Sequence, residues 1–251
     1  MPRYFLEVSY KGSQYSGFQV QENANSVQEE VEKGLAVYLR KPVSLTGSSR
    51  TDTGVHALQN FFHFDLEETL PAKALYNINS MIPQDIVLQN LYQVPADAHC
   101  RFDAVSREYL YHVYQRKDPF LRDRAYYFPY TLRLEALQAA AELVSRQQDF
   151  TSFSKRNTQA KTAICTILES SWVREGNVFT YRVRANRFLR GMVRGLAGTM
   201  LQVGRGKMTL QEFESVFAAM DCSLADFSVP GHGLFLVQVS YPQTLLRQVV
   251  S

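Results

Sequence analysis

The sequence predicts an α+β fold with two similar halves, residues 1–103 and 104–251. Two patterns predict the elements: alternation of apolar and polar side chains indicates strands, and amphipathic periodicity indicates helices. In each half the elements follow in the order strand, helix, strands, helix, strand. The 251 residues are enough to bury one large core or two packed halves. Together the halves are expected to form a mixed, mainly antiparallel central sheet with helices on one face.

The elements of the first half follow from periodicity and capping. Arg3–Tyr10 alternates as a strand, and Ser26–Glu29 has the form of a capping box that opens a helix. That helix should end near Pro42, because proline disfavours the helical conformation of the residue before it. Its buried face is expected to carry Val27, Val31 and Leu35. Further strands are expected at 43–45, 58–65 and 86–94, and a second helix at 72–81.

The second half repeats this order after a join near 95–103. Residues 107–114 parallel the first strand of the chain. The glycines at 204 and 206 lack the spacing of a phosphate loop and are interpreted as a helix terminus followed by a turn. Helices are predicted at 132–146, 186–201 and 209–220, and strands at 163–173, 178–185 and 234–241.

Composition excludes several classes of protein. Hydrophobic residues make up 45% of the chain and charged residues 20%, which rules out disordered, collagen-like and coiled-coil chains. The 3 cysteines form no C-x-x-C pair, which fits a reducing compartment such as the cytoplasm. No apolar run is long enough to span a membrane, so a soluble chain without a signal peptide is expected. The 5 histidines show no metal-ligand spacing, and no metal site is predicted.

One stretch of the chain is basic although the net charge is only +3. On the predicted helix 186–201, Arg187, Arg190 and Arg194 would share a narrow stripe. Such a stripe is either a solvated face or a surface for a phosphate backbone, and the absence of acids favours the second. Between Phe179 and Leu210 there is no acidic residue, and the cations are Arg182, Arg184, Arg187, Arg190, Arg194, Arg205 and Lys207.

The loop Gly47–Ala57 is the densest cluster of special residues. It carries the guanidinium of Arg50 and the carboxylate of Asp52 two positions apart. Taken alone, Asp52 reads most simply as a turn residue bonded to its own backbone. The functional reading is a nucleophilic or basic carboxylate that a neighbouring arginine keeps ionised. The tyrosines on strand 107–114 are interpreted first as half-buried sheet residues, one of which could stack on a base.

Residues 50–57 resemble the Arg-Thr-Asp-x-Gly-Val-His-Ala signature of the TruA type of tRNA pseudouridine synthase. Departures are small: Ser48-Ser49 stand where alanine or glycine is commoner, Val229-Pro230-Gly231 replaces Ala-Pro-Ala, and Ala98 replaces an aromatic residue. The resemblance covers essentially the whole chain, through further landmarks in order at 17–19, 26–28, 101–104, 107–111, 149–153, 188–194 and 233–236.

The resemblance implies the pseudouridine synthase fold and an enzyme that isomerises uridine to pseudouridine in the anticodon stem-loop of tRNA, at tRNA positions 38 to 40. It implies a cytoplasmic homodimer without a cofactor, since the isomerisation gains and loses no atom. It also implies that Asp52 is catalytic and pairs with Arg194, and that Tyr109 packs on the target base. Arg50 would help to hold the RNA backbone or the flipped nucleotide, and Arg190 would contact phosphate.

Two other functions stay open at this point. A non-catalytic RNA-binding module would need only basic and aromatic residues, but it gains nothing from a carboxylate amid phosphates. A nucleoside hydrolase would release free uracil. The sequence also leaves open whether the aspartate attacks the sugar, attacks the base or removes a sugar proton to give a glycal.

Overall fold

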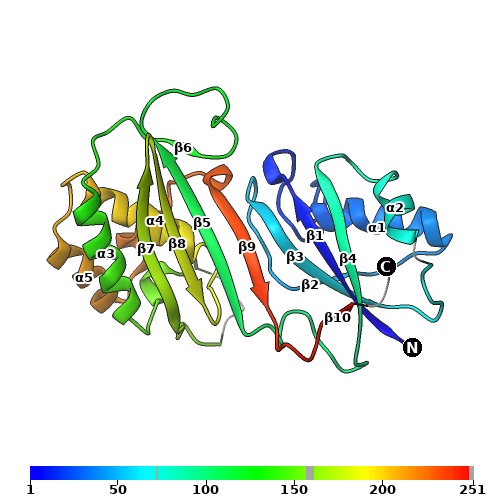
Figure 1. Cartoon of the computed structure of the whole chain (residues 1–251). Coiled ribbons are helices and arrows are strands. Elements are labelled where there is room, and N and C mark those ends of the chain that lie inside the picture. The colour runs from blue at the N-terminus through cyan, green and yellow to red at the C-terminus, as the bar shows by residue number, and fades with distance from the viewer. Residues whose placement is uncertain (72, 157–160, 249–251) are drawn as a thin grey trace. The chain divides into compact units, whose positions relative to one another are not determined.

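The chain forms two units, which the computed structural model describes over residues 1–71, 73–156 and 161–248 (Figure 1). Unit 1 comprises Met1–Val105 and Leu236–Ser251, and unit 2 comprises Ser106–Phe235. The predicted α+β class is confirmed. The division differs from the predicted 1–103 and 104–251, because the chain returns to unit 1 at its end. There the amide of Val239 donates to Gln59 Oε1 at 3.0 Å.

Unit 1 is built on a mainly antiparallel sheet in the order β10-β4-β1-β3. The central strand β1 pairs antiparallel with both β3 and β4, and the short β2 pairs with β3. The unit 1 part of β9 follows β3. The strand bounds are β1 (Arg3–Tyr10), β2 (Thr46–Gly47), β3 (His56–Asp65), β4 (Ile86–Val94), β9 (Leu234–Ser240) and β10 (Arg247–Gln248).

The helices of unit 1 are α1 (Val27–Leu39) and α2 (Ala74–Asn79), which contact each other, while α2 also contacts β4. The Ser26 side chain caps α1 by accepting from the Glu29 amide at 3.2 Å, as predicted. The helix ends before Pro42, also as predicted. The helix predicted at 72–81 is shorter, and its first residue lies outside the described residues. A 3₁₀ turn, η1, covers Gly12–Gln14.

The strand predicted at 43–45 is wrong, since the strand begins at Thr46. The backbone of Leu45 is bonded to side chains of α1 and not to a neighbouring strand. Its amide donates to Glu32 Oε1 at 2.9 Å, and its carbonyl accepts from Gln28 Nε2 at 2.8 Å.

Unit 2 carries the antiparallel strand order β5-β8-β7, with β6 parallel to β5. The strand predicted at 163–173 begins later than expected, because residues before Ile167 bond to a segment that precedes them. The Phe150 amide donates to the Ala163 carbonyl at 3.1 Å. The bounds are β5 (Ser106–Tyr114), β6 (Tyr126–Tyr127), β7 (Ile167–Glu175) and β8 (Val178–Ala185).

A single helical layer covers the sheet of unit 2. Helix α3 contacts β7 and α4, and α4 contacts β5 and α5, so the helices share one face of the strands. Trp172 and Tyr181 stack in the core at 5.2 Å between ring centroids. No helix in the described part of the chain is long and apolar enough to cross a membrane. The bounds are α3 (Leu134–Arg146), α4 (Met192–Gly204), α5 (Leu210–Ala219), η2 (Thr151–Phe153), η3 (Cys222–Leu224) and η4 (Gly231–Gly233).

The helix predicted over 186–201 begins only at Met192. Gly191 adopts φ +76°, a left-handed conformation that ends any helix approaching from 186–190. The Lys155 amide donates to the Arg190 carbonyl at 3.0 Å and holds this loop instead. The helical stripe of Arg187, Arg190 and Arg194 is therefore wrong. The predicted helix terminus at 204, followed by a turn, is confirmed.

Candidate catalytic loop and nucleic-acid interface

The loop that carries Asp52 connects β2 to β3 in unit 1, and a buried amide fixes its start. Asn60 on β3 is fully buried. Its Oδ1 accepts from Ser48 Oγ at 2.8 Å, and its Nδ2 donates to the Ser49 carbonyl at 2.9 Å and to the Tyr10 hydroxyl at 3.3 Å. One side chain thereby joins the loop to the sheet at several points.

Thr51, directly before the aspartate, is held from two sides. Its Oγ1 lies 2.8 Å from the Tyr10 hydroxyl, and its carbonyl accepts from the Phe18 amide at 3.1 Å. Gly17 has φ +131°, and a Cβ there would lie 3.0 Å from the Thr51 carbonyl oxygen. Only glycine therefore allows this segment to approach the loop so closely.

Asp52 begins a tight turn. The Val55 amide donates to the Asp52 carbonyl at 3.2 Å, and Gly54 adopts φ +76°. His56, buried at the end of the turn, accepts the Gly12 amide at Nδ1 at 3.1 Å. The Asp52 side chain is half-buried. The turn reading and the catalytic reading of Asp52 are thus compatible, since the turn is made by its backbone and the reaction would use its side chain.

Arg50 is exposed at the start of this loop. Arg50 and Asp52 belong to one segment whose backbone is fixed on both sides. Sequence reasoning singled out these two residues but not the ones that hold them, Tyr10 and Asn60. In the sequence both look like ordinary strand residues.

In unit 2, Tyr109 lies on β5 with 8% of its surface exposed. Its ring meets the edge of Phe188 at 5.1 Å between centroids. Two residues on, Tyr111 donates its hydroxyl proton to the Pro230 carbonyl at 2.9 Å, and burial raises the pKa of Tyr111 far above its ordinary value. Tyr109 and Tyr111 are therefore both buried sheet residues, and the Tyr109 ring also contacts Phe188, two positions before Arg190.

Arg194 lies in the first turn of α4, and a neighbouring loop orients it. Its Nε donates to the Val229 carbonyl at 2.8 Å and its Nη2 to the Phe227 carbonyl at 3.3 Å. A Cβ at Gly198 would lie 2.1 Å from the Asp226 carbonyl oxygen, so the helix and this loop are in backbone contact. Both of these hydrogen bonds of Arg194 are accepted by main-chain carbonyls, which explains why Val229 can replace an alanine here.

No acidic residue lies between Phe179 and Leu210 in the sequence, but the fold brings acidic residues of other strands close to some of its arginines. On β8, Arg182 lies 2.7 Å from a Glu108 oxygen of β5, and Arg184 lies 3.9 Å from Glu169 of β7. Arg205 stacks over the Tyr130 ring at 3.8 Å. In the part of the chain that the structure describes, no acidic partner is found for Arg187, Arg190 and Lys207.

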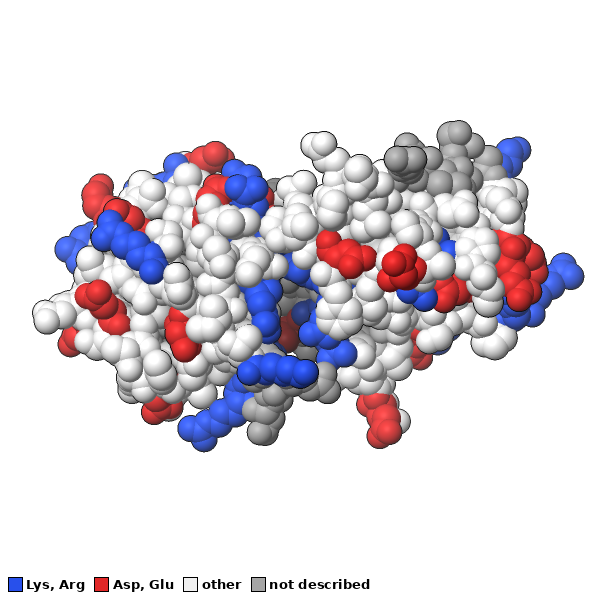
Figure 2. All heavy atoms as spheres, turned by 90° about the horizontal axis from the view of Figure 1, so that it is seen from below, with Lys and Arg blue, Asp and Glu red and all other residues white. Residues whose placement is uncertain are grey.

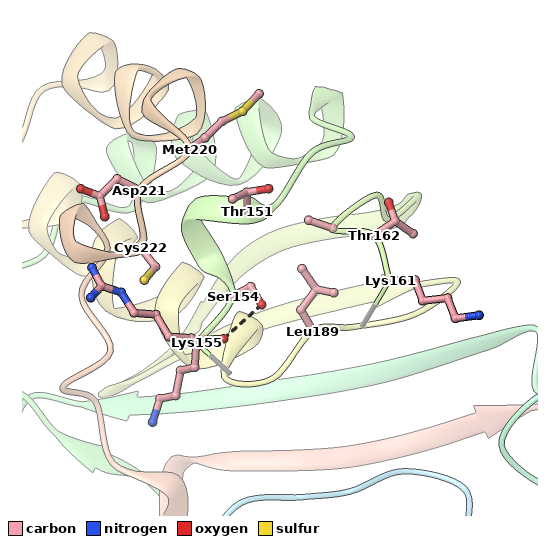
Figure 3. A pocket seen from close by; sticks show the side chains of 11 residues that line it. Thr151, Ser154, Lys155, Lys161, Thr162, Leu189, Met220, Asp221 and Cys222 are labelled. Carbon is pink, nitrogen blue, oxygen red and sulfur yellow. Dashed lines mark hydrogen bonds between the residues drawn. The ribbon is translucent and has the colours of Figure 1, made fainter. Parts of the chain in front are cut away.

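A cavity of about 450 Å³ lies beside the Arg190 loop (Figure 3). Lys155, Arg156 and Lys161 contribute cations to its lining, against the single carboxylate of Asp221. Hydrogen bonds from Ser223, with the charge of Arg156, lower the pKa of Asp221. Figure 2 shows that Lys and Arg side chains and Asp and Glu side chains both occur on the face that it draws. Cations such as Lys155 and Lys161 are suited to phosphate groups.

Comparison with known proteins shows which class of protein the chain belongs to. A family model described as tRNA pseudouridine synthase matches residues 140–242. The tRNA pseudouridine synthase A of Parabacteroides distasonis is 43% identical over 247 residues, 98% of each chain. Those of Bacteroides thetaiotaomicron and Porphyromonas gingivalis are 42% and 41% identical, over 99% and 98% of this chain and 94% and 99% of theirs.

This class is the one that the fold and the Asp52 loop indicate, and its members are isomerases. More particularly, the chain belongs to the tRNA pseudouridine synthase A family. The matched relatives extend over the Asp52 loop, whereas the family model begins only at residue 140.

Tyr10→Phe tests whether the hydrogen bonds behind the loop position Asp52. The change removes one buried hydroxyl, so we expect about 1 kcal/mol lower free energy of unfolding. We also expect kcat to fall with little change in KM, because the loop shifts while RNA contacts stay. Tyr92→Phe is the matched control, since it removes a hydroxyl that donates to Glu7 at 2.9 Å and does not touch the loop. Equal kcat values in the two variants would contradict a positioning role for Tyr10.

Proposed function

We propose that this protein converts uridine to pseudouridine in the anticodon stem-loop of tRNA, at positions 38 to 40, with Asp52 as the catalytic carboxylate. The single observation that carries the proposal is the near-full-length relation to tRNA pseudouridine synthases A. The hydrogen-bonded loop that presents Asp52 supports it.

The reaction requires from the protein one carboxylate and a closed pocket that keeps the detached uracil in place. The bond from ribose to a ring nitrogen breaks, the uracil turns in place, and ribose bonds to a ring carbon. That carbon releases its proton and the freed ring nitrogen takes up one, so no atom is gained or lost. A carboxylate can form and then break a bond to the sugar or the base, or can take and return a sugar proton. All three routes use Asp52, and none needs a cofactor to balance atoms or electrons.

The target uridine must leave its base stack to reach a carboxylate, at a cost of a few kcal/mol. Tyr109 is proposed to stack on the flipped base, and its edge contact with Phe188 fixes the ring for this role. Arg50 is proposed to bind the flipped nucleotide or its phosphates. The pairing of Arg194 with Asp52 stays a prediction. The backbone contacts of Arg194 are compatible with a guanidinium held in one orientation.

We further propose that the protein acts in the cytoplasm as a homodimer. All 3 cysteines are free thiols, which fits a reducing compartment. The non-catalytic RNA-binding module and the nucleoside hydrolase are the competing functions, and the products formed from tRNA distinguish them.

The first test compares the parent protein with Asp52→Asn on tRNA tritiated at the uracil carbon that becomes bonded to ribose. We expect release of tritium by the parent and none by Asp52→Asn, with tRNA affinity within a few-fold. Asp97→Asn is the matched control, because Asp97 is exposed in unit 1 and lies outside the loop. Free uracil in solution would instead indicate a hydrolase, and tight binding without release by the parent would indicate a binding module.

Arg190→Glu tests the proposed phosphate contact. Loss of one cation–phosphate contact should weaken tRNA binding and lower the slope of log K against log salt by about 0.7 to 0.9. The control Arg146→Glu changes the charge equally at the end of α3, where Arg146 pairs with Glu142. If filter binding gives Arg190→Glu the affinity and salt slope of that control, Arg190 does not contact phosphate.

A further inference from the structure

Two histidines and a cysteine meet in unit 1, outside the Asp52 loop. His63 lies on β3, and His99 and Cys100 lie in the segment that follows β4. One ligand atom from each lies within 4.8 Å of the others. His63 Nδ1 is 3.2 Å from Cys100 Sγ, and the two histidine rings are 4.6 Å apart between centroids. His63 and Cys100 are 37 positions apart, so the chain spacing alone does not reveal the group.

We propose that His63, His99 and Cys100 form a structural site for a borderline-soft divalent cation, of which Zn²⁺ is the best fit. Two imidazoles and a thiolate are the donors that Zn²⁺ prefers. With bonds of about 2.0 Å to nitrogen and 2.3 Å to sulfur, a tetrahedral ion separates N and S by about 3.6 Å. The observed separation of 3.2 Å needs only a few tenths of an ångström of movement.

Hydrogen bonds already orient both imidazoles with a lone pair at Nδ1. His99 Nδ1 accepts from the Arg101 amide at 3.1 Å, and His63 Nδ1 accepts from the Cys100 amide at 3.4 Å. Both rings therefore carry their proton on Nε2 and act as neutral donors. At His63, whose Nδ1 lies 3.2 Å from Cys100 Sγ, the cation would replace the Cys100 amide proton as the partner of this lone pair.

The surroundings of the group balance the charge of a cation and a thiolate. The Arg3 guanidinium is bonded to both Asp65 oxygens at 2.8 Å. The charge of Arg101, which acts on His99, is opposed by Asp103, which accepts the His99 amide at 2.7 Å. Cys100 Sγ also donates to the Thr46 carbonyl of β2 at 3.1 Å, so that oxygen or a water is the fourth ligand available.

The cation would hold together segments that are far apart in the sequence. His63 lies on β3, Thr46 on β2, and Cys100 lies shortly before the chain enters unit 2 at Ser106. The Tyr241 hydroxyl donates to the Cys100 carbonyl at 2.5 Å and brings the chain end to the same point. Such a site stabilises unit 1 and takes no part in the isomerisation.

Cobalt provides the test, because Co²⁺ occupies zinc sites and reports on its ligands. The full-length protein is freed of metal with a chelator and titrated with Co²⁺. We expect one equivalent of Co²⁺ to bind. The complex should show a thiolate-to-cobalt charge-transfer band and visible absorption bands as intense as those of tetrahedral Co²⁺, and excess Zn²⁺ should remove both. Zn²⁺ should also raise the Tm of the apoprotein. Absence of a thiolate band in the parent overturns the proposal whatever the variants do.

Variants assign the ligands. Cys100→Ser and His63→Gln should lose the charge-transfer band or weaken Co²⁺ binding at least ten-fold. Cys165→Ser is the matched control, because Cys165 is also buried but lies in unit 2. Retention of the band in Cys100→Ser with its loss in Cys222→Ser would place the cation elsewhere and refute the site. Pseudouridine formation at ambient temperature should be unchanged in all of these variants, which separates this test from that of Asp52.

Discussion

The arrangement of the Asp52 loop depends on the side chain of Asn60. A primary amide buried completely costs free energy unless its donors and acceptor are bonded, and here they bond to Ser48, Ser49 and the Tyr10 hydroxyl. Any other path of the loop would leave these groups unsatisfied in the core of unit 1. The backbone at Thr51 is thereby fixed before any RNA binds, and the backbone of Asp52, whose carbonyl accepts the Val55 amide, continues from it.

This constraint explains why so few groups suffice for the proposed reaction. A carboxylate held by the fold does not have to be ordered by the substrate, so binding free energy from tRNA remains for extruding the nucleotide. In unit 2 the main-chain carbonyls of Phe227 and Val229 orient Arg194 in a similar way. In unit 1, Arg50 is exposed and Asp52 is half-buried, whereas Tyr10 and Asn60, which hold their loop, are buried.

The sequence predicts the regular elements well where periodicity determines them. The bounds of β1, β4 and β8 agree residue for residue with the predicted ranges, because alternation on a sheet is a local signal. The start of α4 was missed because φ of Gly191 depends on packing against Lys155, which lies far away in the sequence. For the same reason Arg187 and Arg190 were placed on a helix that does not include them.

The candidate site shows the same limit. The motif of residues 50–57 identified Asp52, but Tyr10 and Asn60 are recognised as its supports only when β1 and β3 are paired. The charges of Arg182 and Arg184 were counted as free because Glu108 and Glu169 lie on neighbouring strands and not in the same segment. The His63, His99 and Cys100 group is not evident in the sequence, because the fold brings the segment after β4 against His63 on β3.

The most direct measurement of the central claim is amide hydrogen exchange of the free protein, without tRNA. The amides of Ser48, Phe18 and Gly54 donate to Phe61, Thr51 and Tyr15 within unit 1. A loop fixed before RNA binds requires these amides to exchange far more slowly than in an unstructured peptide. Exchange at the unstructured rate, with protection only when tRNA is added, would contradict a preformed catalytic loop.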